Sequence, residues 1–111
     1  MSPSPTRDTA RADVWTAISN PLRRQILDEL QAGPVAVRDL ARRFDVTRPA
    51  VSQHLTILLA ADLVREERVG RERRYRLDPA PLREVQGWLG HYEQFWSERL
   101  HRLRDVLDRE P

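Results

Sequence analysis

Apolar residues recur every three or four positions through most of the chain, and this spacing predicts a mainly helical protein. The first helical stretch begins near Ala10 and is interrupted by Asn20-Pro21, an N-cap residue followed by proline at the first position of a new helix. That second helix ends before Gly33. A short third helix is expected over 37–44.

The stretch 47–60, "TRPAVSQHLTILLA", predicts a fourth helix that differs between its two ends. Thr47 can cap its N-terminus, and the connection to the preceding helix is then only three residues, 45–47. On a helical wheel one side is apolar and carries Val51, Leu55, Leu58 and Leu59. The opposite side is mostly polar, is concentrated in the first half, and carries Arg48, Pro49, Ser52, Gln53 and Thr56.

Two unusually polar, arginine-rich segments follow, at 63–69 and 71–77, on either side of Gly70. Their arrangement predicts a β-hairpin with a glycine in its turn. The cations near its tip are Arg68, Arg71, Arg73 and Arg74. They are expected to flank the fourth helix, although arginine and glutamate also serve to protect an ordinary solvated strand edge.

The last apolar stripe predicts one closing helix over 79–108, capped by Asp78. Its stripe is wider than one small domain can cover, and large aromatic side chains are common interface anchors. We therefore expect a dimer interface made by Trp15, Leu89, Tyr92, Phe95, Trp96, Leu100 and Leu103. The alternative is that these side chains complete the core of the monomer.

The length of 111 residues favours one domain, assigned here to residues 10–108 after a disordered tail over 1–9. Cysteine is absent, which excludes disulfides and thiolate ligands. The sequence shows neither a membrane-spanning run nor a secretory signal, so a cytoplasmic location is expected.

The positive charge is concentrated in two segments. All 19 basic residues are arginine, and the net charge is only +2. Residues 38–56 and 63–77 nevertheless carry ten arginines against five acidic residues. This distribution indicates a polyanionic partner.

Two helices joined by a three-residue turn, followed by a hairpin, are typical of a winged helix-turn-helix. The polar front of the helix over 47–60 can enter a DNA major groove, where arginine reads guanine and glutamine reads adenine. An ordinary amphipathic helix with a solvated face is the alternative for this helix taken alone. The nearby arginine-rich hairpin favours DNA.

The segments "NPLRRQIL", "VSQHLTILLAADLV" and "VGRERRYRL" resemble the corresponding parts of the ArsR/SmtB family of bacterial repressors, over about residues 12–107. Asp62 departs from the usual glycine. The resemblance implies a dimer through the first and last helices, and DNA contacts from Thr47, Arg48, Pro49, Ser52 and Gln53, with His54 near the backbone. The closing helix is most similar to the branch without an evident metal site, the SdpR-like autorepressors.

Metal sensing is not expected. The cysteine ligands of one family site are absent. The closing helix carries His91 and His101, but Leu89 and Arg104 stand where the other family site needs ligands. No cofactor is expected either, and the pattern does not bring a nucleophile and base together, so an enzyme is not expected.

The sequence therefore predicts a homodimeric DNA-binding repressor of a palindromic promoter site, with autoregulation as one version. One alternative is a repressor released by a small organic ligand bound near the closing-helix aromatics. Another is a winged-helix protein-interaction module without specific DNA binding.

Overall fold

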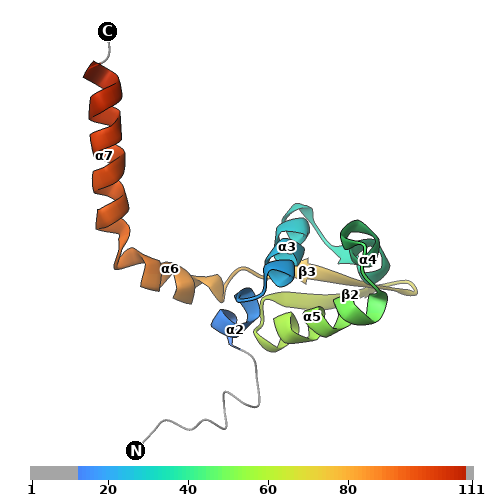
Figure 1. Ribbon diagram of the computed structural model, residues 1–111. Helices are drawn as coiled ribbons and strands as arrows, with labels where there is room; N and C mark the ends of the chain where they lie inside the picture. Colours follow the sequence, from blue (N-terminus) through green and yellow to red (C-terminus); the bar gives the residue numbers. More distant parts are fainter. Residues whose placement is uncertain (1–12, 110–111) are drawn as a thin grey trace, which may run out of the picture.

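The computed structural model describes residues 13–109, apart from the side chains of residues 100, 108 and 109. It consists of helices around one small sheet (Figure 1). In chain order the elements are α2 (Val14–Ile18), α3 (Pro21–Glu29), the 3-10 turn η1 (Leu30–Ala32), β1 (Val35–Ala36), α4 (Val37–Phe44), α5 (Arg48–Ala60), β2 (Val64–Val69), β3 (Glu72–Leu77), α6 (Leu82–Gly90) and α7 (Glu93–Arg109). The predicted tail over 1–9 and the predicted helix start at Ala10 lie outside the described residues.

The predicted apolar stripes meet in one core between α2–α5 and the sheet. Its largest fully buried side chains are Ile26, Leu30, Leu40, Val51, Leu55, Leu58, Leu63 and Val64. Burying one such side chain contributes about 1.5–3 kcal/mol relative to leaving it in water. The core therefore fixes the rear face of α5 and, with it, the direction in which the front face points.

Local capping explains where the helices begin. The Asn20 side chain accepts hydrogen bonds from the backbone N–H groups of Leu22 and Arg23, and Thr47 accepts one from Ala50. Between α4 and α5, Asp45 adopts a left-handed conformation with φ 53° that reverses the chain. The predicted bounds of α4 and α5 and the three-residue turn between them are confirmed.

The predicted hairpin is present as β2 and β3, and Gly70 in its turn has φ 65°. The register runs from Val64 opposite Leu77 to Val69 opposite Glu72. A third strand, β1, was not predicted, and it pairs antiparallel with β3 to give the order β1-β3-β2. A two-residue strand is too short to show an alternating pattern in the sequence.

The prediction of a single closing helix over 79–108 is wrong. The chain forms α6 and α7, separated at residues 91–92, directly after Gly90. Tyr92 N–H bonds to Leu89 O at 2.9 Å, a tight-turn hydrogen bond in place of the regular helical one. Asp78 does not cap α6, because its side chain accepts from Ala80 N–H in the preceding loop at 3.1 Å.

The start of α6 is attached to the rest of the protein by Leu82 and Val85, which pack against the core, and by an aromatic contact with α2. Trp15 Nε1–H donates to the Glu84 carboxylate at 2.8 Å, and its ring meets the edge of Trp88 with centroids 5.7 Å apart. Beyond this point α7 projects away from the other helices (Figure 1). The radius of gyration is 18.7 Å, whereas a compact chain of this length has about 13 Å.

The outer helices expose an apolar face, which we call the outer apolar face. Its members on α6, α7 and the link between them are Trp88, Leu89, Tyr92, Phe95, Trp96, Leu103, Val106 and Leu107. Within residues 13–109, no helix has the length and apolar character that crossing a membrane requires.

Candidate nucleic-acid interface

The two sides of α5 are separated as the sequence pattern indicates. Val51, Leu55 and Leu58 are fully buried. The polar side is exposed to solvent and comprises Thr47, Arg48, Pro49, Ser52, Gln53 and Thr56. The exposed side chains cluster toward the N-terminal half, so the leading end of α5 is an accessible polar surface.

His54 differs from these neighbours because it is half-buried and contacts Arg23 of α3. The Arg23 Nη1 and His54 Nδ1 atoms are 3.2 Å apart. Since guanidinium nitrogens only donate, Nδ1 accepts, and a neutral His54 carries its proton on Nε2. Burial, and after it the charge of Arg23, lower the pKa of His54 below its ordinary value.

A cavity of about 300 Å³ lies between the N-termini of α4 and α5 and the tip of the hairpin. Its polar lining comes from all three elements and comprises Arg38, Arg48, Ser52, Arg71, Glu72 and Arg73; Ala36 and Val37 complete it. The fold thus brings predicted residues of α5 and of the hairpin together around one arginine-rich hollow.

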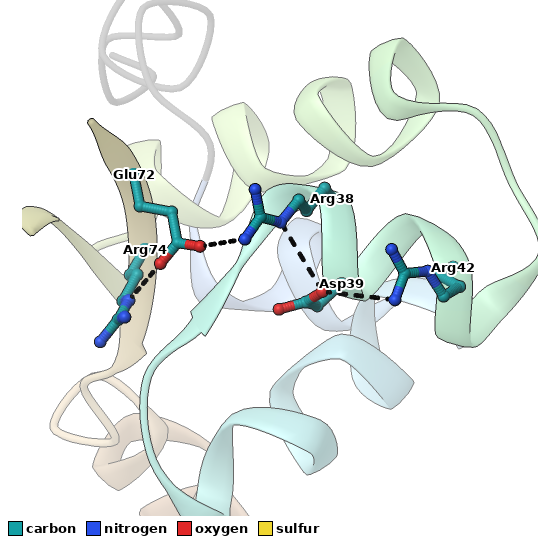
Figure 2. A network of polar contacts seen from close by, with 5 residues as sticks. All are labelled: Arg38, Asp39, Arg42, Glu72 and Arg74. Atoms are coloured by element: carbon teal, nitrogen blue, oxygen red, sulfur yellow. Dashed lines mark hydrogen bonds and ion pairs between the residues drawn. The ribbon is translucent and has the colours of Figure 1, made fainter. Parts of the chain in front are cut away.

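Acidic side chains already hold some of these arginines. Figure 2 shows Glu72 between Arg38 of α4 and Arg74 of the same strand, with carboxylate–nitrogen distances of 2.5 and 2.8 Å. The hydrogen bond from Arg74, together with the charge of Arg38, lowers the pKa of Glu72. On α4, Asp39 lies 3.9 Å from Arg38 and 4.0 Å from Arg42 (Figure 2).

Arg73 is held on the other face of the hairpin. Its Nε–H donates to the Glu66 carboxylate, which also accepts from the Tyr75 hydroxyl at 3.1 Å. These two hydrogen bonds, the one from Arg73 first, lower the pKa of Glu66. Arg73 is therefore both a wall of the cavity and part of an internal network.

Three predicted DNA-contacting arginines are not held in an ion pair with another described residue. Arg48 at the start of α5, and Arg68 and Arg71 beside the hairpin turn, are exposed and form no ion pair within the described part of the chain. Exposed arginines of this kind can form bidentate contacts with phosphate or with guanine. This surface therefore combines three arginines that form no ion pair with other arginines that are paired with acidic side chains.

Sequence reasoning missed two residues of the cavity, Arg38 and Glu72. They are 34 positions apart in the chain and belong to different elements, so their contact depends on tertiary structure. The excess of arginine over acidic residues in both segments was the available signal.

The remaining predicted side chains lie away from this surface. His91 and His101 are exposed. Among the described residues, no three histidine, aspartate or glutamate side chains converge in a way that could hold a metal ion. The predicted interface residue Leu100 lies in α7, but its side chain is outside the described residues.

Comparison with known proteins places the chain among DNA-associated regulators. Residues 18–67 match a family model described as a helix-turn-helix domain. The chain is 41% identical over 96 residues to the HTH-type transcriptional regulator Rv2034 of Mycobacterium tuberculosis, covering 86% of this chain and 87% of that protein. It is 36% identical over 77 residues to the transcriptional repressor SdpR of Bacillus subtilis, covering 69% and 86%.

Solved structures of related proteins share the fold of this chain. An ArsR-like transcriptional regulator from Rhodococcus sp. RHA1 superimposes with a TM-score of 0.68 at 31% identity, covering 96% of this chain and 95% of that one. NolR from Sinorhizobium fredii gives 0.59 at 31% identity, covering 83% and 97%.

Proposed function

The chain belongs to the ArsR/SmtB family of helix-turn-helix transcriptional regulators, and from this premise we propose that it is a dimeric repressor that binds a palindromic promoter site in double-stranded DNA. One observation carries the proposal. The leading end of α5 is polar and exposed, while its rear is locked in the core, and it lies beside an arginine-bearing hairpin.

In this proposal the N-terminal half of α5 enters the major groove. Arg48 offers a bidentate donor to guanine, and Gln53 offers a donor and an acceptor to adenine. Ser52 and Thr56 contact bases or phosphates. The half-buried His54 lies on the core side of these residues. It contacts Arg23 and is not assigned a role in reading bases.

The hairpin acts as the wing. Arg68 and Arg71, near its tip, are free to contact phosphates or to reach the minor groove. Gly70 allows the tight turn that brings both of them to the tip. These contacts add affinity that depends little on sequence.

A second copy of the chain covers the outer apolar face. Exposed tryptophan, tyrosine and phenylalanine side chains anchor such interfaces, and a two-fold dimer presents two recognition helices to two half-sites. SdpR is named a repressor. By analogy we propose that the bound dimer blocks transcription in the cytoplasm, with its own promoter as one candidate site.

The test is DNA binding by Arg48→Ala and Gln53→Ala on a site selected by the wild-type protein. Each loss is expected to cost about 1–3 kcal/mol and to relax the base preference at one position. Arg83→Ala and Gln25→Ala are matched controls, because both residues are exposed on other helices.

Two results oppose the proposal. Unchanged base preference in both variants removes α5 from the reading role. Weak, sequence-blind binding by the wild type would support the alternative of a protein-interaction module.

A further inference from the structure

Glu72 holds an unusual place in a surface otherwise suited to anions. It is the one acidic residue among the described residues that line the 300 Å³ cavity. Both of its carboxylate oxygens are engaged, one with Arg38 Nη2 and the other with Arg74 Nε (Figure 2). Its side chain is 25% exposed, whereas that of Arg38 is 52% exposed. The Glu72 side chain is thus less accessible to solvent than the Arg38 side chain that it holds.

Backbone pairing already attaches the wing to the start of α4. Strand β1 leads directly into α4 and already pairs with β3, with Val35 opposite Tyr75 and Ala36 opposite Arg74. These backbone hydrogen bonds fix the start of α4 against the wing. The attachment of α4 to the wing therefore does not depend on the side-chain bridge alone.

Carboxylate and phosphate compete for the same guanidinium donors. Both are anions that accept paired N–H groups from arginine. An arginine that is already neutralised by a carboxylate releases few counterions when it meets a DNA phosphate, and sequence-independent affinity comes from that release.

We propose that Glu72 is a specificity-determining residue that acts as an internal competitor of the DNA phosphate. It keeps Arg38 and Arg74 occupied and thereby limits binding to non-cognate DNA. Attraction to phosphate then comes mainly from Arg48, Arg68 and Arg71, which form no ion pair with another described residue. These three arginines approach the bases only when α5 occupies the major groove. This inference rests on the proposed function.

The test measures binding of E72Q to a random-sequence duplex as salt is raised from about 50 to about 200 mM. Loss of the carboxylate frees one or both arginines, so the salt slope should steepen by about one to two units. Affinity at the lower salt should rise about fivefold or more. The selected site should gain less than the random duplex, because its base contacts are unchanged.

Two further variants separate competition from a general change of charge. E67Q removes the same charge from the same wing. Glu67 lies opposite Arg74 in the strand register but forms no ion pair with another described residue, so its slope should change by clearly less than that of E72Q. E72D keeps the charge but shortens the side chain, so one carboxylate can no longer reach both guanidinium groups. It should steepen the slope in the same direction as E72Q, by a smaller amount.

Equal slopes for E72Q and E67Q would overturn the inference, as would weaker binding by a folded E72Q. Thermal unfolding of each variant shows that it is folded. Both results leave the proposed function intact as long as the wild type binds its selected site. A wild type that binds no duplex would instead remove the proposed function itself.

Discussion

Arg23 shows how this fold satisfies a buried charge. Its side chain is 8% exposed. Nε donates to Ala17 O at 2.8 Å and Nη2 donates to Thr16 O at 3.1 Å. These carbonyls end α2, where the helix dipole favours a cation, and the third contact reaches His54 on α5. One residue therefore links the first described helix to the helix that we assign to DNA reading.

Arg23→Met should lower the free energy of unfolding by about 2–3 kcal/mol, because it removes two charge-assisted hydrogen bonds and takes from the Ala17 carbonyl its side-chain donor, whereas the Thr16 carbonyl still accepts from Ser19. Chemical denaturation measures the loss. Arg24→Met is the control, since the Arg24 side chain is exposed and, among the described residues, donates to Ile18 O alone. Similar losses in the two variants would mean that the buried contacts add nothing specific.

His54 predicts a pH dependence of stability. Its pKa in the folded protein lies below the ordinary value of 6.5, so the unfolded chain takes up the proton at a higher pH than the folded chain does. The contribution of neutral His54 is therefore fully present above pH 6.5 and is lost as the pH falls below it. Denaturation at several pH values between about 5 and 7 measures this loss.

His54→Gln should flatten that dependence, because glutamine does not titrate. The acidic groups with lowered pKa values, such as Glu66 and Glu72, titrate at lower pH. We therefore assign the loss of stability between about pH 7 and 5 to His54. If the variant keeps the full slope of the wild type, another group is responsible.

At the scale of elements, local signals were enough for the helices of the DNA-reading motif. Asn20 and Thr47 cap α3 and α5 through the bonds that their side chains predict. The apolar side of α5 was predicted to be internal, and Val51, Leu55 and Leu58 are buried. Short-range chemistry determines these features, and a single sequence displays it.

Features that depend on distant partners were not visible. Strand β1 exists because Val35 and Ala36 meet β3, and no local pattern marks them. The break after Gly90 was hidden because apolar spacing continues through it, although glycine is a weak helix former. In the site, the sequence identified the arginines of α5 and of the hairpin but missed Arg38. It also could not show which arginines are paired with Glu66 and Glu72.

The wing is expected to act through phosphate contacts. Arg71→Ala removes an exposed cation at the tip and should reduce the salt slope of binding by about one unit, with little change of base preference. Arg83→Ala removes the same charge from α6 and should leave the slope near that of the wild type. An unaltered slope in Arg71→Ala would exclude a phosphate contact at this position.

At the scale of the molecule, we expect the extended α6–α7 arm to pack against a second copy of the chain. It exposes the outer apolar face, including Phe95 and Trp96, and within residues 13–109 α7 has no extensive contact with the other elements. Trp96→Ala should weaken dimerisation at least tenfold, since a large aromatic anchor contributes about 2 kcal/mol or more. Sedimentation velocity measures the association, with Gln94→Ala as the control on the same helix. A Trp96→Ala dimer as stable as that of the wild type would contradict the assigned interface.

Selection of bound sequences from random duplex DNA, at a fixed salt concentration, tests the central claim most directly. We predict an enriched palindrome whose half-sites are separated by about 10 base pairs or a multiple of this spacing, the distance that a two-fold dimer imposes. Recovered duplexes without any shared motif would contradict the account, because an exposed reading helix that is held rigidly by the core must prefer some bases over others.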